Sequence, residues 1–506
     1  MTLRRIFLGG LAAALALPLA ARDISSAVRR AIEGEPALRG ASVGVSIKDM
    51  DGNTLADIAA CKRLVPASNL KLVTTGCALL RRGAAWRFKT LLFADHDEGM
   101  WLRDSILHGN LRIRGGGDPM VDENYFERWK DILDSAGIKA IEGDIIGDGS
   151  AWSFPYDNGS WSYEDIGTYY GAGADGLCFY KNAIDFSVRA GKEVGDEVFI
   201  EKEYPRVPWL TVRNNSVTGP KGSGNSLYLF TGDFSSNCEL RGSYAIDRRP
   251  KTEHFANKHG ALTCAYLFRN YLISNGISVS GSYGTVASSA AFPCSTELGR
   301  SFSPSLEDLV LECNRISDNF LAEALLRQAV LVDMENAGPT FTHPADSCLE
   351  RERIALTALF LQQDRGIAED AGSIPGQIKI VDGCGLSRQN LLSPDFITEF
   401  LLRMYCNSRN DVFLPFYQSL PRPGEYTLKD FNPAKGGTGD AGRFSLKSGS
   451  MDGILCYSGY INERDGATGR PVYSVSVMVN GALAPQSALR RALERVFAQI
   501  SAALPN

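Results

Sequence analysis

The sequence predicts an α+β fold, in which an antiparallel sheet flanked by helices is interrupted by a large β-rich insertion. Alternating apolar and polar residues predict strands near both ends of the chain, at 42–47, 454–461 and 472–479. Apolar residues repeat at helical spacing after Pro304 and again near the C-terminus. Between 86 and 295, short apolar runs alternate with Gly, Pro, Asn and Asp, which is typical of strands and loops.

Length and composition leave room for more than one hydrophobic core. A chain of 506 residues is long for one domain and suggests two or three. Hydrophobic residues make up 44% and charged residues 22%, as in ordinary globular proteins. The net charge is only -5 and no run of Lys and Arg stands out, so a nucleic-acid partner is not expected.

Residues 1–21 have the layout of a secretory signal peptide. Basic residues at 4–5 precede an apolar stretch at 6–19, and the small residues Ala20-Ala21 follow. We therefore expect export to the periplasm with cleavage near Ala20-Ala21, and a buried N-terminal helix is the weaker alternative. No later apolar stretch is long enough to predict a membrane span.

Eleven cysteines in an exported chain raise the question of disulfides. Their number is odd, and they form no C-x-x-C pair or Cys/His cluster, so neither a metal site nor a cofactor is expected. Cys77, Cys264 and Cys456 lie in or beside apolar runs, and we expect most of the cysteines to be small buried hydrophobes. One or two disulfides remain compatible with the sequence, and their pairing cannot be deduced from it.

The first elements after the N-terminal segment are a hairpin and a helix. Strands are predicted at 42–47 and 53–55, on either side of an Asp-Gly turn. A helix start follows at Pro66, and apolar residues continue to Leu80, before a stop at Gly83.

The remaining elements follow from the same patterns. Residues 141–148 suggest a strand between turns, and the Trp and Tyr residues at 152–170 are expected in local core rather than in a ligand platform. Helical stretches are predicted at 306–313 and 321–326. The closing helix presents one apolar face, which we expect to pack on the last strands rather than to touch a membrane: Leu489, Leu493, Val496, Phe497 and Ile500.

Three short strings occur in a fixed order along the chain. They are Ser68-Asn69-Leu70-Lys71, Ser317-Asp318-Asn319 and Lys447-Ser448-Gly449. They match S-x-x-K, S-x-N and K-[ST]-G, the active-site elements of serine enzymes that handle penicillins and D-alanyl peptides. Each string alone is common by chance, whereas an ordered set in suitable local settings is not. The first falls at a helix start, the second between two helical stretches, and the third leads into a strand.

These residue types suit nucleophilic catalysis by a serine. Lys71 lies one helical turn after Ser68, so its amine can reach the hydroxyl and take its proton. This requires that burial and a second cation, for which Lys447 is the candidate, lower the pKa of Lys71. Ser317 can relay a proton to the leaving group, and Asn319 can hold the substrate backbone.

The third motif and the helix start complete the predicted site. Lys447 and Ser448 suit a carboxylate, which fits a peptide that is cleaved near its C-terminus. Backbone N–H groups at the helix start can stabilise the oxyanion of a tetrahedral intermediate.

A Ser-His-Asp hydrolase is a competing interpretation. Residues 40–44 match G-x-S-x-G, but a nucleophile elbow needs a preceding strand and a following helix, whereas an alternating strand follows here. Of the five histidines, only His343 lies in the C-terminal third. We therefore disfavour this class.

The chain resembles the D-alanyl-D-alanine carboxypeptidase/endopeptidases of the class C low-molecular-mass penicillin-binding proteins. Beyond the motifs, the likeness includes Gly117-Asp118-Pro119 and the runs at 143–145, 161–172 and 381–388. The resemblance implies a penicillin-recognising serine transpeptidase-like domain. Ser68 and Ser317 lie 249 positions apart (317 − 68), far more than the few dozen positions in class A β-lactamases.

In this family two extra domains fill that gap. The resemblance therefore implies a peptidase domain at 22–85 and 296–506 and two nested domains within 86–295. It also implies functional roles: Ser68 as acylated nucleophile, Lys71 as base, Ser317 and Asn319 as second element, Lys447-Ser448-Gly449 as third element, and the N–H groups of Ser68 and Ser450 as oxyanion hole. Ser448 replaces the commoner Thr, and Cys384 stands where the family's loop usually has Ser.

We therefore expect a periplasmic serine peptidase that removes the terminal D-alanine from peptidoglycan peptides, or cuts D-alanyl cross-links, through an acyl-enzyme on Ser68. β-Lactams should acylate the same serine. A non-catalytic peptidoglycan-binding scaffold with a relic site and a β-lactamase are the alternatives, and the second needs fast deacylation. The oligomeric state and the preferred diamino acid of the stem peptide stay open.

Overall fold

The computed structural model describes residues 24–152, 158–233, 235–286, 293–336, 378–406, 410–436, 441–464 and 469–505. The expected signal peptide and His343 lie outside these residues. The chain forms two compact units. The first holds the described parts of Met1–Ala84, Leu306–Asp318 and Arg353–Asn506, and the second those of Ala85–Ser305 and Asn319–Glu352.

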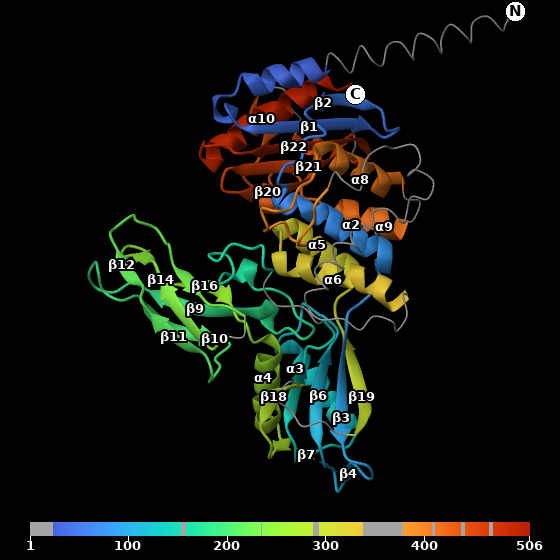
Figure 1. The fold of residues 1–506 in the computed structure, drawn as a ribbon, viewed down its shortest axis with the longest axis vertical. Helices are drawn as coiled ribbons and strands as arrows, with labels where there is room; N and C mark the ends of the chain where they lie inside the picture. Colours follow the sequence, from blue (N-terminus) through green and yellow to red (C-terminus); the bar gives the residue numbers. More distant parts are fainter. Residues whose placement is uncertain are drawn as a thin grey trace, which may run out of the picture. The chain divides into compact units, whose positions relative to one another are not determined.

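A five-stranded antiparallel sheet forms the centre of the first unit. Its order is β2-β1-β22-β21-β20, so strands from both ends of the chain pair directly with one another (Figure 1). The strands are β1 (Ser42–Asp49), β2 (Thr54–Ile58), β20 (Phe444–Met451), β21 (Ile454–Asn462) and β22 (Pro471–Asn480). The predicted hairpin and the predicted pair of C-terminal strands are confirmed. The third motif lies within β20 and not ahead of it, so the prediction that it leads into a strand is wrong by a few residues.

Helices flank this sheet, as the α+β class predicts. Residues 24–33 form a helix that shares one apolar cluster with the sheet and with α10 (Gln486–Ala503). Elsewhere α8 (Pro394–Cys406) packs on β1 and β22, and α2 (Leu70–Arg82) packs on α5 (Leu306–Ile316) and α9 (Asn410–Gln418). The predicted helix start and the stop at Gly83 are confirmed. Gly83 has φ +79°, which suits glycine.

The apolar face of α10 is buried. Leu489, Leu493 and Phe497 are 0% exposed and belong to the cluster that includes the strands. The predicted packing on the last strands is confirmed, and this face is not available to a membrane surface. Among the described residues, no helix combines the length and apolar character that a membrane span requires.

The second unit is rich in strands. Its larger sheets have the orders β18-β8-β6-β3-β19 and β17-β7-β5-β4, and its smaller ones β10-β9-β16, β11-β14-β13 and β12-β15. The strands are β3 (Lys89–His96), β4 (Leu102–Arg103), β5 (Ile106–Leu107), β6 (Asn110–Gly115), β7 (Ala140–Ile141), β8 (Ile145–Asp148), β9 (Ala183–Arg189), β10 (Phe199–Tyr204), β11 (Thr211–Asn214), β12 (Val217–Gly219), β13 (Tyr228–Phe230), β14 (Asn237–Arg241), β15 (Ser243–Ala245), β16 (Lys251–Ala256), β17 (Ser278–Val279), β18 (Tyr283–Thr285) and β19 (Cys294–Phe302). The single strand predicted at 141–148 is two short strands.

The second unit also holds helices that the prediction of strands and loops missed. They are α3 (Asn124–Ser135) and α4 (Gly260–Ser274), and α6 (Asn319–Asn336) also belongs to this unit. Phe126 and Trp129 of α3 are buried at helical spacing beside Phe268 of α4. Their apolar periodicity is short and lies among many turn residues, so the signal is weak. A second apolar cluster, with Phe186 and Tyr244, lies among the strands β9 to β16.

Ten of the eleven cysteines lie in the described ranges. Cys77, Cys264 and Cys456 are at most 3% exposed, which confirms the prediction that they are small buried hydrophobes. No disulfide occurs among the cysteines in the described ranges. Trp152 and Trp161 are buried, as expected for local core, whereas Tyr163 and Tyr169 are exposed.

Candidate active site

Ser68 and Lys71 lie together at the start of α2. A 3-10 turn, η2 (Ala67–Asn69), leads into the helix and places Ser68 in its first turn. Lys71 is 0% exposed, and its Nζ lies 3.0 Å from Ser68 Oγ. The predicted approach of the amine to the hydroxyl is therefore present in the structure.

The turn that carries Ser68 is strained. Ala67 has φ +47°, in the left-handed region that side chains with a Cβ rarely adopt. Asn69, the second residue of the motif, donates from Nδ2 to Ser458 Oγ of β21 at 2.7 Å, and Ser458 is in turn bonded to Ser476 of β22 at 2.8 Å. This buried polar chain ties the turn to the centre of the sheet, which helps to hold the strained conformation.

Gly449 lets β20 approach this turn. A Cβ at position 449 would lie 2.6 Å from the carbonyl oxygen of Pro66 and 3.0 Å from the backbone nitrogen of Ser68. No side chain fits there without a shift of backbone. The glycine of the third motif thus has a steric reason, which is the close approach of strand and helix start.

β20 is the edge strand of the sheet, and its outer edge is only partly used. The N–H of Leu446 donates outward, to the carbonyl oxygen of Pro421 at 2.9 Å. The pairing of β20 with β21 has no bulge, so alternate residues Ser448 and Ser450 direct their N–H groups to the same outer edge. Ser450 is exposed. Its N–H is therefore directed to the outer edge of the sheet.

Lys447 is a second buried lysine. It is 0% exposed, and its Nζ donates to Ser317 Oγ at 2.8 Å and to the carbonyl oxygen of Ser448 at 2.9 Å. Burial, and then the positive charge of Lys71, hold the pKa of Lys447 well below its usual value. The predicted second cation therefore lies close enough to Lys71 for the two charges to repel each other.

Ser317 and Asn319 lie on either side of the boundary between the two units. Ser317 follows α5 and has φ +61°, a strained conformation of the kind that occurs at functional sites. Asn319 begins α6 in the second unit, where its Nδ2 donates to the carbonyl oxygen of Tyr170 at 2.9 Å. Within the first unit, the structure brings together Ser68, Lys71, Ser317 and the third motif. The role of Asn319 stays a prediction.

A contact that the sequence did not reveal comes from the loop at 381–388. The carbonyl oxygen of Cys384 accepts a hydrogen bond from Lys71 Nζ at 2.6 Å, and that of Gly383 accepts one from Thr74 Oγ1 at 2.7 Å. Both contacts use backbone oxygens, which any residue supplies. The replacement of the usual Ser by Cys384 therefore leaves this contact with Lys71 intact. Only the Gly-rich character of the loop could have indicated it from the sequence.

The competing nucleophile elbow has no suitable setting. Ser42 begins β1, which is followed by a turn and by β2 rather than by a helix. Its Oγ accepts a hydrogen bond from Lys62 Nζ at 2.8 Å. This arrangement lacks the strand-turn-helix geometry that a Ser-His-Asp nucleophile requires.

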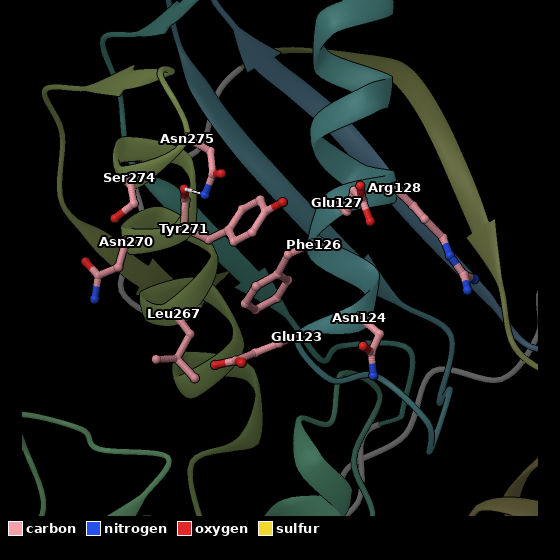
Figure 2. A pocket seen from close by; sticks show the side chains of 10 residues that line it. All are labelled: Glu123, Asn124, Phe126, Glu127, Arg128, Leu267, Asn270, Tyr271, Ser274 and Asn275. Carbon is pink, nitrogen blue, oxygen red and sulfur yellow. Dashed lines mark hydrogen bonds between the residues drawn. The ribbon is translucent and has the colours of Figure 1, made fainter.

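The second unit has a separate pocket of about 710 Å³ between α3 and α4. Figure 2 shows the rings of Phe126 and Tyr271 between the two helices, and Glu127 beside Arg128. None of its lining residues belongs to the three motifs.

Three features define the class of penicillin-recognising serine enzymes. They are a five-stranded antiparallel sheet, a Ser-Lys pair at the start of the adjacent helix, and a buried lysine on the edge strand. The chain belongs to the D-Ala-D-Ala carboxypeptidase 3 (S13) family, whose model matches residues 24–500. The predicted enzyme class, a serine-type D-Ala-D-Ala carboxypeptidase, is confirmed by this membership.

Two curated relatives are named D-alanyl-D-alanine carboxypeptidases. The D-alanyl-D-alanine carboxypeptidase of Actinomadura sp. (strain R39) is 27% identical over 446 residues, which cover 86% of this chain and 78% of the relative. The D-alanyl-D-alanine carboxypeptidase DacB of Haemophilus influenzae is 24% identical over 448 residues, 84% of each chain.

The fold agrees with a solved structure. The crystal structure of penicillin binding protein 4 (dacB) from Haemophilus influenzae matches with a TM-score of 0.75 and 21% identity, over 93% of this chain and 98% of that one. The same protein complexed with a novel β-lactam matches with a TM-score of 0.70 and 19% identity, over 94% of this chain and 99% of that one. The predicted fold class is therefore confirmed.

Proposed function

We propose that this enzyme hydrolyses the terminal D-alanyl-D-alanine bond of peptidoglycan stem peptides through an acyl-enzyme on Ser68. One observation carries the proposal. Lys71 Nζ lies 3.0 Å from Ser68 Oγ. Lys71 is completely buried, whereas Ser68 is partly exposed. A serine hydroxyl needs such a base to become nucleophilic.

Acylation begins when Lys71 takes the proton from Ser68 Oγ. The oxygen then attacks the carbonyl carbon of the penultimate D-alanine, and the oxyanion accepts hydrogen bonds from the N–H groups of Ser68 and Ser450. Collapse of the intermediate breaks the C–N bond, and the departing D-alanine amine receives a proton from Lys71 through Ser317. Water then hydrolyses the ester by the same route, which regenerates Ser68.

The two buried lysines, Lys71 and Lys447, have different roles in this mechanism. Burial and the positive charge of Lys71 lower the pKa of Lys447, so Lys447 gives up a proton more readily than an exposed lysine and can take one up in its turn. Lys447 lies 2.8 Å from Ser317 Oγ and completes the proton path. With Ser448, it also suits the C-terminal carboxylate of the substrate, and Asn319 offers an amide to its backbone. These contacts favour an exopeptidase, and cleavage of D-alanyl cross-links is a second activity of the same site.

Further features follow from the proposal. β-Lactams carry a strained amide in place of the scissile bond, so they acylate Ser68 and leave slowly.

Residues 1–21 direct the chain to the periplasm, with cleavage near Ala20-Ala21. Two nested domains lie within 86–295, and two separate apolar clusters in the second unit support them.

The test is the intact mass of the enzyme after incubation with benzylpenicillin, with Ser68→Ala alongside. We expect a stable adduct on the wild type alone, and loss of carboxypeptidase activity in the variant. Drug consumption without a lasting adduct would instead indicate a β-lactamase. An unmodified wild-type protein with unconsumed drug would support the non-catalytic scaffold and refute the proposal.

A further inference from the structure

The loop that follows Val381 touches the Ser68 turn at a second place besides Lys71. Gly385 has φ +85°, and a Cβ there would lie 2.0 Å from the carbonyl oxygen of Ala67 and 3.1 Å from the backbone nitrogen of Ser68. The backbone of the loop therefore lies directly against the residue that precedes the nucleophile.

Three consecutive residues thus contact the start of α2, each through its backbone. Gly383 accepts from the helix at Thr74, Cys384 accepts from Lys71, and Gly385 packs on the turn of Ser68. Because each of these contacts uses the backbone of the loop, the conformation of the loop decides where the contacts fall.

One buried carboxylate fixes that conformation. Asp382 is 1% exposed, and its Oδ1 accepts hydrogen bonds from the N–H of Gly385 and from Asn390 Nδ2, both at 2.8 Å. Its Oδ2 accepts one from the N–H of Ser387 at 2.6 Å. Asn390 closes the loop, because its Oδ1 accepts from the N–H of Val381 at 2.8 Å. Charge-assisted bonds of this kind are short and strong.

We propose that Asp382 is a positioning residue for acylation. Its carboxylate fixes the loop from Gly383 to Gly385. It thereby holds in place the carbonyl oxygen of Cys384, which orients Lys71 toward Ser68. It touches neither substrate nor the reacting atoms. This inference rests on the proposed function, since it concerns the rate at which Ser68 is acylated.

The test replaces Asp382 by asparagine. The amide keeps the shape of the side chain, but its NH₂ group replaces one of the two acceptor oxygens of the carboxylate. This NH₂ group then faces an N–H donor, so at least one of the hydrogen bonds that hold the loop is lost. We expect the rate constant for acylation by a chromogenic cephalosporin to fall roughly 10- to 100-fold, as for other residues that orient a reacting group. The dissociation constant of the complex that precedes acylation should change by less than about 2-fold, because the substrate contacts remain.

The amount of adduct separates positioning from a merely structural role. If Asp382 only supports folding, Asp382→Asn will lower the fraction of chains that react, while the reacting chains keep the wild-type rate constant. A positioning role predicts one adduct per chain formed slowly. A wild-type rate constant in Asp382→Asn, at any adduct level, overturns the proposal.

Two further variants keep the result interpretable. Thr74→Val removes the hydrogen bond that Thr74 Oγ1 donates to the carbonyl oxygen of Gly383, and it should also slow acylation, by roughly 3- to 10-fold. This variant serves as the test if Asp382→Asn does not fold. An unchanged rate of acylation in Thr74→Val would then refute the proposal. Ser46→Ala removes a buried hydrogen bond to Thr398 elsewhere in the same unit and should keep the wild-type rate. Failure of the wild type to acylate at all would instead refute the proposed function.

Discussion

Burial shifts the pKa of single residues in this protein. Asp118 of the second unit is 1% exposed, and its carboxylate accepts hydrogen bonds from the N–H of Met120 and from Tyr125 Oη, both at 3.0 Å. Both bonds favour the ionised form, but burial outweighs them and raises the pKa of Asp118 to about 6. The same physical cause acts with the opposite sign on Lys447, a buried cation whose pKa is lowered.

The raised pKa of Asp118 predicts a pH dependence of stability. The unfolded chain ionises this group near pH 3.8 and the folded protein near pH 6, so its stabilising contribution is present below pH 3.8 and is lost as the pH rises through 6. As the pH rises from 3.8 to 6, we expect this one group to lower the free energy of unfolding by roughly 2 to 3 kcal/mol.

Asp118→Asn should lack that part of the pH dependence, since the amide cannot ionise and keeps an acceptor for Met120. Urea denaturation of both proteins across this pH range, followed by tryptophan fluorescence, measures the difference. Parallel pH profiles of the two proteins would contradict the pKa assigned to Asp118.

At the scale of elements, the site depends on how closely β20 approaches the start of α2. The strand can do so because its third motif ends in Gly449, where a Cβ would lie 2.6 Å from the carbonyl oxygen of Pro66. A side chain at this position would meet backbone atoms of η2, which cannot rotate away as the end of a flexible side chain can.

Gly449→Ala should therefore separate the strand from the Ser68 turn. We expect acylation by benzylpenicillin to slow about 100-fold, the effect of displacing a catalytic geometry by about 1 Å. The second-order rate constant of acylation measures this. Gly159→Ala is the matched control, because a Cβ there has no atom within 4 Å and the backbone is not strained. An unchanged rate in Gly449→Ala would mean that the strand and the turn can move apart without cost to catalysis.

At the scale of the whole molecule, the first unit is closed by the pairing of the two chain ends. β1 pairs with β22 along its full length, and α10 covers the sheet with a buried apolar face. Phe497 of this helix is 0% exposed, and its ring lies 5.5 Å from Phe431, 5.4 Å from Phe444 and 6.0 Å from Tyr457. A helix far from the motifs in sequence thus stabilises the strand that carries the third one.

Phe497→Ala should destabilise the first unit by about 3 to 5 kcal/mol, because it removes a large buried ring and leaves a cavity. The fraction that remains folded should be acylated at the wild-type rate. Differential scanning calorimetry together with acylation kinetics measures both effects. Leu483→Ala is the control, since Leu483 is fully exposed and its loss should change stability by less than about 0.5 kcal/mol. Equal stability of the two variants would refute the role given to α10.

The sequence by itself determined the fold class, the strands at both ends, the helix start at Ser68 and the family to which the chain belongs. These features depend on the spacing of neighbouring residues and on short motifs, which are properties of consecutive positions. It did not reveal α3 and α4, whose short apolar periods lie among turn signals.

Only the tertiary structure decided which groups surround the nucleophile. Lys71 and the carbonyl oxygen of Cys384 are 313 positions apart, and their contact exists only after the loop and α2 have packed together. The steric need for Gly449 and the lowered pKa of Lys447 also arise from packing, since a close approach and the loss of water are properties of neighbours in space.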